Sequence, residues 1–300
     1  MKIDPLAIRP SLCERFTETV PVPEMNMLTA DGWVAEQKLD GIRVLARVVG
    51  PRVTFLGRNG RPVNHAGALK LLPAVKQALL DAFRPIGTKA VVVLDGELLV
   101  DDGCFIVFDL PWFGPTSHQP RVTPADTLTE RRIWLEQVFA TTKPDPAVVR
   151  PVYQARTTDE KMALRDLIAE ADAEGIVYKR SESRYLSGRR SPDWLKLKLF
   201  READLVVTGT ALDGKENVTL GVNVDGVLVE VGRCSTLGKD KPEVGDVVEV
   251  KYLYLGAGGR LYQPELLRIR TDKDPDECTI DQLVSVNKSL VDACDFDGDI

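Results

Sequence analysis

The chain has 300 residues, of which 44% are hydrophobic and 28% charged, and this composition is typical of a globular protein long enough for two domains. Its formal net charge is −6, so it is not a uniformly basic nucleic-acid binder. It contains no run of eighteen apolar residues, and its first residues, MKIDPLAIRPSL, lack an apolar signal core. We therefore predict a cytoplasmic protein that does not enter a membrane.

The first two hundred residues mix strand and helix patterns. Residues 1–30 are polar and interrupted by prolines, which predicts an irregular lead-in. Strand patterns follow at 33–39, 42–49, 53–57, 91–100 and 104–110, and helical patterns lie at 66–83, 128–140 and 159–173. Hairpin spacings occur beside crossover spacings, so we predict an α+β domain over residues 1–200 rather than a doubly wound sheet.

The pattern changes near residue 200. Short apolar segments separated by turn residues recur in 201–214, 218–224, 226–232, 246–255 and 266–271, which predicts a small β-barrel in a second domain over 201–300. After Lys273 the chain has eight acidic residues and one lysine. This end of the chain is predicted to be an acidic tail, with a short helix over 279–290 and a disordered tip.

Charge is distributed unevenly along the chain. Residues 1–200 carry 28 Lys and Arg against 25 Asp and Glu, whereas residues 201–300 carry 11 against 20. Within 179–198 there are seven basic residues and two acidic ones. Because screening shortens the reach of distant charge, such a basic stripe can contact phosphates even on an acidic protein.

Neither cysteine nor histidine chemistry is predicted. The five cysteines lie far apart and form no C-x-x-C pair, so we expect scattered reduced thiols rather than a disulfide framework or a zinc ribbon. The two histidines, His65 and His118, lack the acid and nucleophile context of a hydrolase triad. The chain also has no P-loop and no G-x-G-x-x-G opening a helix.

A set of lysines and carboxylates is more informative. The motif K-x-D-G-x-R runs from Lys38 to Arg43 between apolar segments, where a partly desolvated lysine is either a structural fault or a reactive amine. Further motifs follow in order: LGRNG, LDGEL, FIVFDL, EGIVYK and WLKLK. Taken singly, D-G-E reads as a hairpin turn and WLKLK as an amphipathic edge strand whose two lysines share one face.

Taken together and in order, these motifs and R-I-R-T-D-K at 268–273 resemble the ATP-dependent DNA ligases of the covalent nucleotidyltransferase superfamily. The resemblance spans positions 36–273. It implies a nucleotidyltransferase domain, an ATP-grasp-like adenylation domain, over 1–200 and an OB-fold β-barrel over 201–300. It also implies a minimal two-domain ligase of bacterial, bacteriophage or viral type, acting as a monomer on nicked duplex DNA.

The resemblance further implies a reaction. Lys38 would attack the α-phosphate of ATP to form lysyl-AMP, AMP would pass to the 5′-phosphate of a nick, and the neighbouring 3′-hydroxyl would displace AMP. Mg²⁺, with Mn²⁺ as an alternative, would assist. The catalytic residues would be Lys38, Asp40, Lys196, Lys198, Asp272 and Lys273.

The remaining site residues are implied in the same way. Glu36 would lie near the adenine edge and Phe105 would stack on the base, although plain core filling is an alternative for Phe105. Arg43 and Arg58 would reach the ribose, the nick phosphate or the flanking strand. Glu97 and Glu174 would contact ribose or hold the metal. The phosphate contacts would come from Lys196 and Lys198, with Lys179 nearby, and from Arg190, for which Arg189 is the competing choice.

The residue types suit these roles. Neighbouring cations and burial favour the unprotonated amine that attacks, and they neutralise charge at the phosphoryl centre. Carboxylates hold hard metal ions, and guanidinium forks match phosphate oxygens. An aromatic ring offers a platform for a base.

The sequence departs from the family pattern at one point. Tyr262-Gln263-Pro264 stands where relatives commonly have R-x-P, and a tyrosine offers no guanidinium fork, so Arg260 is a candidate substitute. Two other lysyl-nucleotidyltransferases, RNA ligase and mRNA capping guanylyltransferase, remain alternatives. A non-catalytic OB-type nucleic-acid binding protein is a third. Whether the ligase serves replication, repair or end joining is left open.

Overall fold

The computed structural model describes residues 3–15, 24–87, 89–115, 120–210, 216–256 and 258–285. The chain divides into two compact units. Unit 1 contains Met1–Ile168 and Gly175–Leu197, and unit 2 contains Ala169–Glu174 and Lys198–Asn287. His118, Cys294 and most of the acidic tail lie outside the described residues, so the predictions made for them stay predictions.

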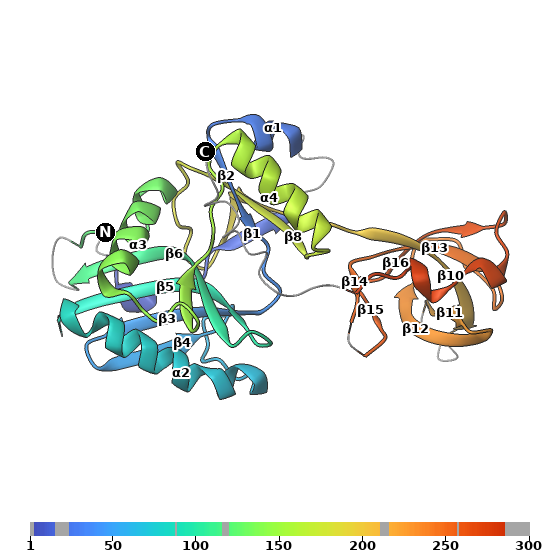
Figure 1. Ribbon diagram of the computed structural model, residues 1–300, viewed down its shortest axis with the longest axis horizontal. Coiled ribbons are helices and arrows are strands. Elements are labelled where there is room, and N and C mark those ends of the chain that lie inside the picture. The colour runs from blue at the N-terminus through green and yellow to red at the C-terminus, as the bar shows by residue number, and fades with distance from the viewer. Residues whose placement is uncertain are drawn as a thin grey trace. The chain divides into compact units, whose positions relative to one another are not determined.

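Unit 1 contains a five-stranded sheet with the order β4-β3-β5-β6-β7. Its strands are β3 (Ile42–Val49), β4 (Arg52–Leu56), β5 (Ala90–Leu99), β6 (Cys104–Pro115) and β7 (Val149–Pro151). The first four pair antiparallel, and β7 joins β6 in parallel. Helices α2 (Ala66–Phe83) and α3 (Leu128–Thr142) cover this sheet (Figure 1).

The two covering helices follow from local sequence. In α2, Ala68, Leu72, Val75 and Leu79 recur at helical spacing and are buried against the sheet. In α3, the Thr127 side chain accepts from the Glu130 amide while the Glu130 carboxylate accepts from the Thr127 amide, a reciprocal capping box. Helix α3 therefore begins where side chains satisfy its first amides.

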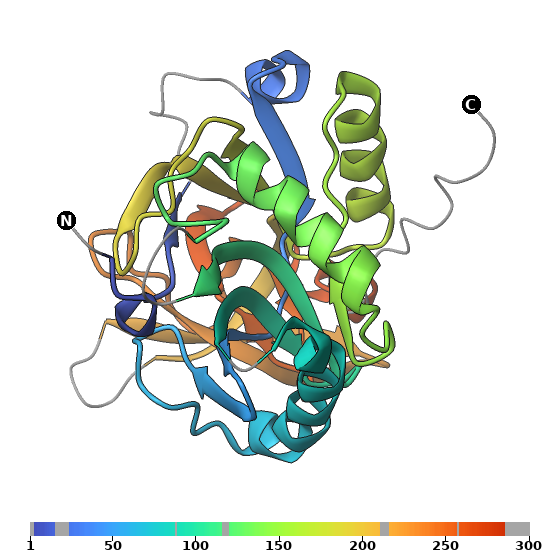
Figure 2. The ribbon, with the colours of Figure 1, turned by 90° about the vertical axis from the view of Figure 1, so that its left-hand side faces the viewer.

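The second sheet of unit 1 has the order β1-β9-β8-β2. Its strands are β1 (Leu12–Arg15), β2 (Trp33–Gln37), β8 (Gly175–Arg180) and β9 (Arg190–Lys198). It is accompanied by α1 (Glu24–Thr29) and α4 (Thr158–Glu170), seen beside it in Figure 2. The prediction of an irregular lead-in over 1–30 was therefore wrong. Strand β1 pairs with β9, and its first residue, Leu12, pairs with Arg190, 178 residues away. Pairing over such a distance leaves no signal in the local sequence.

Two buried contacts tie unit 1 together. An apolar cluster joins the two sheets, with Leu45 and Trp112 from one and Trp194 from the other. The guanidinium of Arg131 on α3 forms an ion pair with Asp109 on β6, Nε to Oδ1 2.7 Å, and both side chains are fully buried. Short 3₁₀ turns lie at Pro5–Ala7 and Arg84–Ile86.

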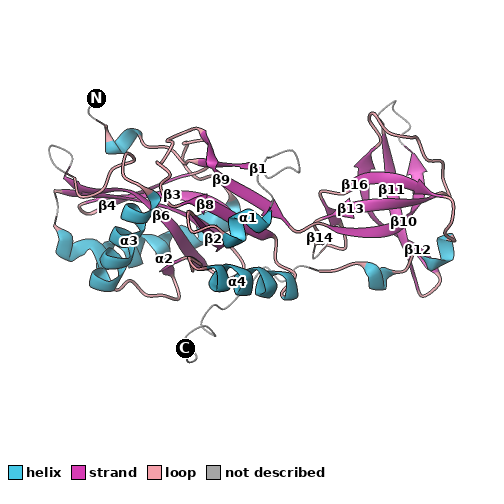
Figure 3. Cartoon of the chain, turned by 90° about the horizontal axis from the view of Figure 1, so that it is seen from above, coloured by secondary structure: helices cyan, strands magenta, loops and turns pink. Residues whose placement is uncertain are grey.

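Unit 2 consists almost entirely of strands (Figure 3). Five antiparallel strands have the order β12-β11-β10-β13-β16: β10 (Arg201–Thr210), β11 (Asn217–Val224), β12 (Val227–Ser235), β13 (Val247–Tyr252) and β16 (Glu265–Arg270). A small pair, β14 (Tyr254–Leu255) with β15 (Leu261–Tyr262), completes the strands, and 3₁₀ turns lie at Pro275–Glu277 and Ile280–Gln282. The described strands do not pair into a closed barrel, so the OB-fold stays a prediction.

Several expectations are confirmed and others corrected. Strand β3 and helix α2 begin and end where the sequence pattern placed them. The D-G-E triplet is not a hairpin turn, because Asp95–Glu97 lies inside β5. Over 279–285, the described part of the predicted short helix, there is only the turn Ile280–Gln282. None of the helices in the described ranges is both long and apolar enough to cross a bilayer.

Candidate active site

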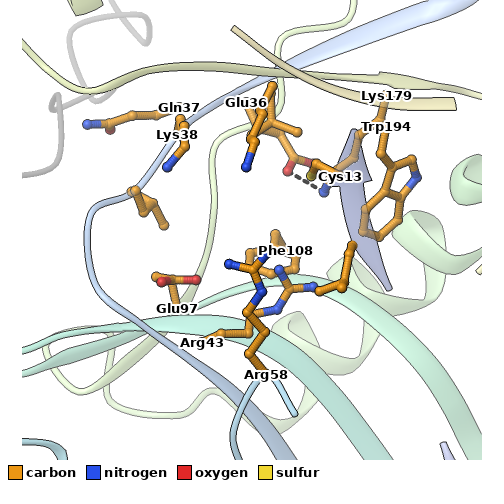
Figure 4. Close-up of a pocket in the computed structure, with 14 residues that line it drawn as sticks. Cys13, Glu36, Gln37, Lys38, Arg43, Arg58, Glu97, Phe108, Lys179 and Trp194 are labelled. Atoms are coloured by element: carbon orange, nitrogen blue, oxygen red, sulfur yellow. Dashed lines mark hydrogen bonds and ion pairs between the residues drawn. The ribbon is translucent and has the colours of Figure 1, made fainter. Parts of the chain in front are cut away.

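A pocket in unit 1 is lined from both of its sheets. The four-stranded sheet contributes residues of β1, β2, β8 and β9, and the five-stranded sheet contributes residues of β3, β5 and β6. In Figure 4, Lys38 and Glu97 lie on one side of the pocket, and Lys179 and Trp194 lie on the other. The lining residues are Leu12, Cys13, Glu36, Gln37, Lys38, Leu39, Arg43, Arg58, Glu97, Phe108, Val177, Lys179, Trp194 and Lys196.

Lys38 enters the pocket from the end of β2. Glu36 and Lys38 are two positions apart, and side chains alternate along an extended chain, so both can face the pocket. The Lys38 amide donates to the Gly175 carbonyl, 2.8 Å, which holds the backbone just beyond the strand. The amine is thus carried by a fixed backbone rather than by a free loop.

The glycines of two motifs are required by close packing. A Cβ on Gly41, in the K-x-D-G motif, would lie 2.5 Å from the Leu98 carbonyl oxygen. A Cβ on Gly96, in the D-G-E motif, would lie 2.4 Å from the Ile106 carbonyl oxygen and 2.7 Å from the Phe105 ring. These glycines let strands β3, β5 and β6 approach closely beneath the pocket.

Gly96→Ala is therefore expected to lower the free energy of unfolding by about 1–3 kcal/mol, the usual cost of overpacking a core. Urea unfolding followed by circular dichroism would measure it. Gly32→Ala is the matched control, because no heavy atom lies within 4 Å of its Cβ position. Equal stabilities of the two variants would contradict the packing argument.

Arg43 is held by a closed ring of hydrogen bonds. Its guanidinium forms a bidentate pair with Asp95, 2.7 and 2.8 Å, and donates to the Ser11 carbonyl, 2.8 Å. Tyr185 closes the ring: its hydroxyl donates to Asp95, 2.5 Å, and accepts from the Ser11 amide, 3.0 Å. Burial alone lowers the pKa of Arg43, but the Asp95 carboxylate outweighs burial and raises it, so Arg43 is permanently charged.

The ring explains two features of the pocket. Asp95, which begins the D-G-E triplet, is fully buried and acts on the site through Arg43. Ser11 precedes Leu12 and Cys13, so the same ring holds the N-terminal strand against the pocket. Burial raises the pKa of the Cys13 thiol even though Arg43, Lys179, Lys196 and Lys38 each lower it, so Cys13 is a neutral thiol at physiological pH.

A second buried cluster lies beside Glu36. Its carboxylate accepts from Lys179 Nζ, 2.5 Å, and from Gln154 Nε2, 2.8 Å. The Lys179 ammonium also lies 4.7 Å from the Phe108 ring centroid and 4.5 Å from that of Trp194. Arg43 lies 4.4 Å from the Phe108 centroid. This side of the pocket therefore combines aromatic rings with a satisfied carboxylate.

The structure brings together half of the residues predicted for the site. Seven of them line the pocket: Glu36, Lys38, Arg43, Arg58, Glu97, Lys179 and Lys196. Asp40 lies in the turn between β2 and β3 and is not among the lining residues. Arg190 is exposed at the start of β9, where it donates to the Cys13 carbonyl, 2.9 Å.

Phe105 does not line the pocket, which corrects its expected place. It is fully buried in the core beneath α2, together with Val107, two residues on. Phe108 lines the pocket instead and packs with Ile106. Residues three apart on a strand point to opposite faces, so only one of the two phenylalanines can face the pocket.

The other predicted residues belong to unit 2. Lys198 pairs with Glu174, 3.0 Å, and Lys273 with Asp204, 2.7 Å. Asp272 forms a bidentate pair with Arg270, 2.7 and 2.8 Å. The hydrogen bonds from Arg270 are the main cause that lowers the pKa of Asp272 to about 2, and a backbone hydrogen bond is the second. Tyr262 stacks on Tyr254, centroids 4.8 Å apart, and Arg260 lies 3.5 Å from Glu230.

Sequence reasoning missed Cys13, Phe108, Gln154 and Trp194. Trp194 is the first residue of WLKLK, and Phe108 belongs to FIVFDL, so both lie within motifs that were recognised. Strand alternation would have separated Phe108 from Phe105. Nothing local marks Cys13 or Gln154, because each reaches the site through pairing with a distant segment.

Comparison with known proteins gives one family match. Residues 102–198 match the family described as the ATP dependent DNA ligase domain. Over this stretch the chain is similar to ATP-dependent DNA ligases. The matched residues include five that line the pocket: Phe108, Val177, Lys179, Trp194 and Lys196.

The relatives of this chain include DNA ligases and end-joining proteins. The chain is 22% identical to the bifunctional non-homologous end joining protein LigD of Bacillus subtilis, over 86% of this chain and 49% of that protein. It is 32% identical to the multifunctional LigD of Pseudomonas aeruginosa, over 59% of this chain and 21% of that protein. The chain thus spans half or less of the length of these relatives.

The fold agrees with that of a solved ligase domain. The structure of the ligase domain of M. tuberculosis LigD aligns with this chain over 92% of this chain and 99% of that domain, with a TM-score of 0.51 and 22% sequence identity. At that identity the likeness concerns the fold. The mixed sheets of this chain therefore share the fold of a solved ATP-dependent DNA ligase domain.

Proposed function

We propose that this chain is an ATP-dependent DNA ligase that seals 5′-phosphate/3′-hydroxyl nicks in duplex DNA through a lysyl-AMP intermediate. The observation that carries the proposal is the pocket itself. Two arginines, two further lysines and two carboxylates line it together with Lys38, and residues 102–198 match the ligase family. A cytoplasmic monomer with a C-terminal OB-fold from about residue 201 completes the proposal.

The chemistry follows from the groups in the pocket. The Lys38 Nζ lone pair forms a bond to the α-phosphorus of ATP, the bond to the β-phosphate oxygen breaks, and pyrophosphate leaves with that electron pair. Lys196 and Arg58, which line the same pocket, neutralise charge on the phosphoryl oxygens. A DNA 5′-phosphate then takes AMP from Lys38, and a 3′-hydroxyl displaces AMP to form the phosphodiester.

The pocket also suggests how the nucleotide is oriented. Its phosphates belong beside Lys38 and Glu97, on one side, because the attacking amine must reach the α-phosphate (Figure 4). Phe108 offers the aromatic face for the base, in place of Phe105, and both Phe108 and Glu36 contact Lys179. In this orientation the Glu36 carboxylate faces the edge of the base.

A magnesium ion fits this site only as a partner of the nucleotide. The described residues contain no cluster of three or more His, Cys, Asp or Glu, so they offer no all-protein metal cage. Mg²⁺ commonly uses one or two carboxylates plus substrate phosphates, and Glu97 lines the pocket as such a carboxylate. Glu97 would hold the ion, which would neutralise phosphate charge; the same role for Glu174 stays a prediction.

Labelling with radioactive ATP tests the proposal. Purified protein is incubated with α-labelled ATP and Mg²⁺ and separated by denaturing electrophoresis, and sealing is followed on a nicked duplex. A labelled band together with sealed DNA supports a DNA ligase. Preference for GTP would indicate a capping enzyme, sealing of RNA alone an RNA ligase, and no labelled band a binding module.

Lys273 provides a test that is specific to one step. By resemblance to the family, the R-x-D-K segment serves the reaction with ATP, so Lys273→Ala is expected to slow lysine adenylylation far more than sealing of pre-adenylylated DNA. The two rates are measured separately under single-turnover conditions. Equal losses in both assays would contradict this role.

A further inference from the structure

Gln154 is a buried amide beside the proposed base-binding side of the pocket. It lies between β7 and α4, and Ala155 next to it forms an isolated antiparallel bridge with Ala35 of β2, with two amide-to-carbonyl bonds of 2.9 Å. This bridge brings Gln154 beside Glu36. Gln154 does not itself line the pocket, so any effect on a ligand passes through Glu36.

The contacts leave the Glu36 carboxylate in one orientation. Lys179 Nζ donates to Oε2, 2.5 Å, and Gln154 Nε2 donates to Oε1, 2.8 Å. The amide is assigned this way round because its oxygen would repel the carboxylate if the group were turned over. With one fixed donor at each oxygen, the carboxylate cannot rotate or fold onto Lys179 with both oxygens.

A carboxylate held in this way discriminates between purines. Each oxygen has a second lone pair, so Glu36 can accept a further hydrogen bond but cannot donate one. Adenine carries an amino group on C6, whereas guanine carries a carbonyl oxygen there. Facing Glu36, the amino group finds an acceptor, and the carbonyl oxygen meets a buried negative charge.

We propose that Gln154 is a specificity-determining positioning residue, which holds the Glu36 carboxylate as the acceptor that selects an adenine nucleotide over a guanine nucleotide. The inference rests on the proposed lysine adenylylation and extends it to a residue outside the pocket. Without the Gln154 amide, the carboxylate turns toward Lys179 and no longer presents a fixed acceptor to the base.

The test compares ATP with GTP in the lysine-labelling reaction. For wild type, Gln154→Leu and Gln154→Asn, kcat/KM of adduct formation is measured with each nucleotide. Gln154→Leu is expected to lower the ratio of the ATP value to the GTP value about tenfold, the worth of one hydrogen bond to a charged group. Gln154→Asn keeps a polar amide, but the asparagine side chain is too short to reach Glu36, so this variant should lower the ATP-to-GTP ratio as well. It keeps the test valid if the leucine variant fails to fold.

Gln137→Leu is the matched control, because Gln137 is exposed on α3, away from the pocket. It should leave the ratio unchanged. A merely structural role for Gln154 predicts equal losses with both nucleotides, and that result, or an unchanged ratio in both Gln154 variants, overturns the inference. Failure of the wild-type protein to label with either nucleotide would instead remove the proposed function, and the inference with it.

Discussion

Lys38→Ala is expected to abolish formation of the covalent adenylate. Removing the nucleophile from a covalent catalyst costs on the order of 10⁶-fold in rate, which takes the reaction below detection. The Gly175 carbonyl holds the Lys38 backbone just beyond β2, and the other two lysines of the pocket stand on different strands, β8 and β9. Mass spectrometry of protein treated with ATP and Mg²⁺ would show the adduct on a Lys38 peptide in the wild type alone.

Two controls sharpen this prediction. Lys38→Arg keeps the positive charge but carries no neutral amine at accessible pH, so it too should form no adduct while still binding ATP. Lys70→Ala removes an exposed lysine from α2 and should label at the wild-type rate. An adenylate found on another residue in Lys38→Ala would refute the assignment of the nucleophile.

Sealing of DNA separates the two chemical halves of the reaction. Lys38→Ala should still close a nick whose 5′-phosphate has been adenylylated beforehand, although more slowly, because that final step does not use the Lys38 adduct. Complete loss of this activity would show that Lys38 also acts in the last step or that the variant is misfolded. Circular dichroism distinguishes these two explanations.

The largest effect on stability is expected at Arg131. Arg131→Met should lower the free energy of unfolding by about 3–5 kcal/mol, because it leaves the fully buried Asp109 carboxylate without its countercharge. The Asp126 and Ser183 carbonyls lose their guanidinium donor in the same change. Denaturant unfolding at neutral pH measures the loss in the free energy of unfolding, with the two-state analysis applied to spectroscopic signals from unit 1.

An exposed ion pair serves as the comparison. The side chains of Arg84 and Asp81 are 77% and 53% exposed, and Arg84→Met should change stability by less than about 1 kcal/mol. Adding Asp109→Leu to Arg131→Met removes the orphaned charge and should recover part of the loss. If the two single arginine variants were equally stable, the buried pair would contribute nothing beyond a surface pair.

This pair changes the interpretation of one motif. Asp109 ends F-I-V-F-D, a stretch that sequence reasoning associated with the nucleotide. In the structure its carboxylate is buried against α3, and Phe108, beside it, faces the pocket. The motif therefore combines an aromatic ring that lines the pocket, Phe108, with a buried carboxylate, Asp109, that pairs with α3. Asp95 is similar, since it holds Arg43 from a fully buried position in β5.

The sequence by itself determined the chemical groups, the family they resemble and most of the elements. Period-two and helical patterns placed β3 and α2, because such patterns record which face of an element is buried. The ordered motifs predicted seven of the residues that line the pocket, including Lys38.

The tertiary structure alone decided which side chains share the pocket and what holds them. It placed Phe108 rather than Phe105 at the wall, set β1 against β9, and joined Glu36 to Gln154 across 118 residues. These outcomes depend on strand register and on pairing between distant segments. The local conformational preferences of residues do not encode strand register or long-range pairing, because register is fixed only when the two sheets pack and bury their shared core.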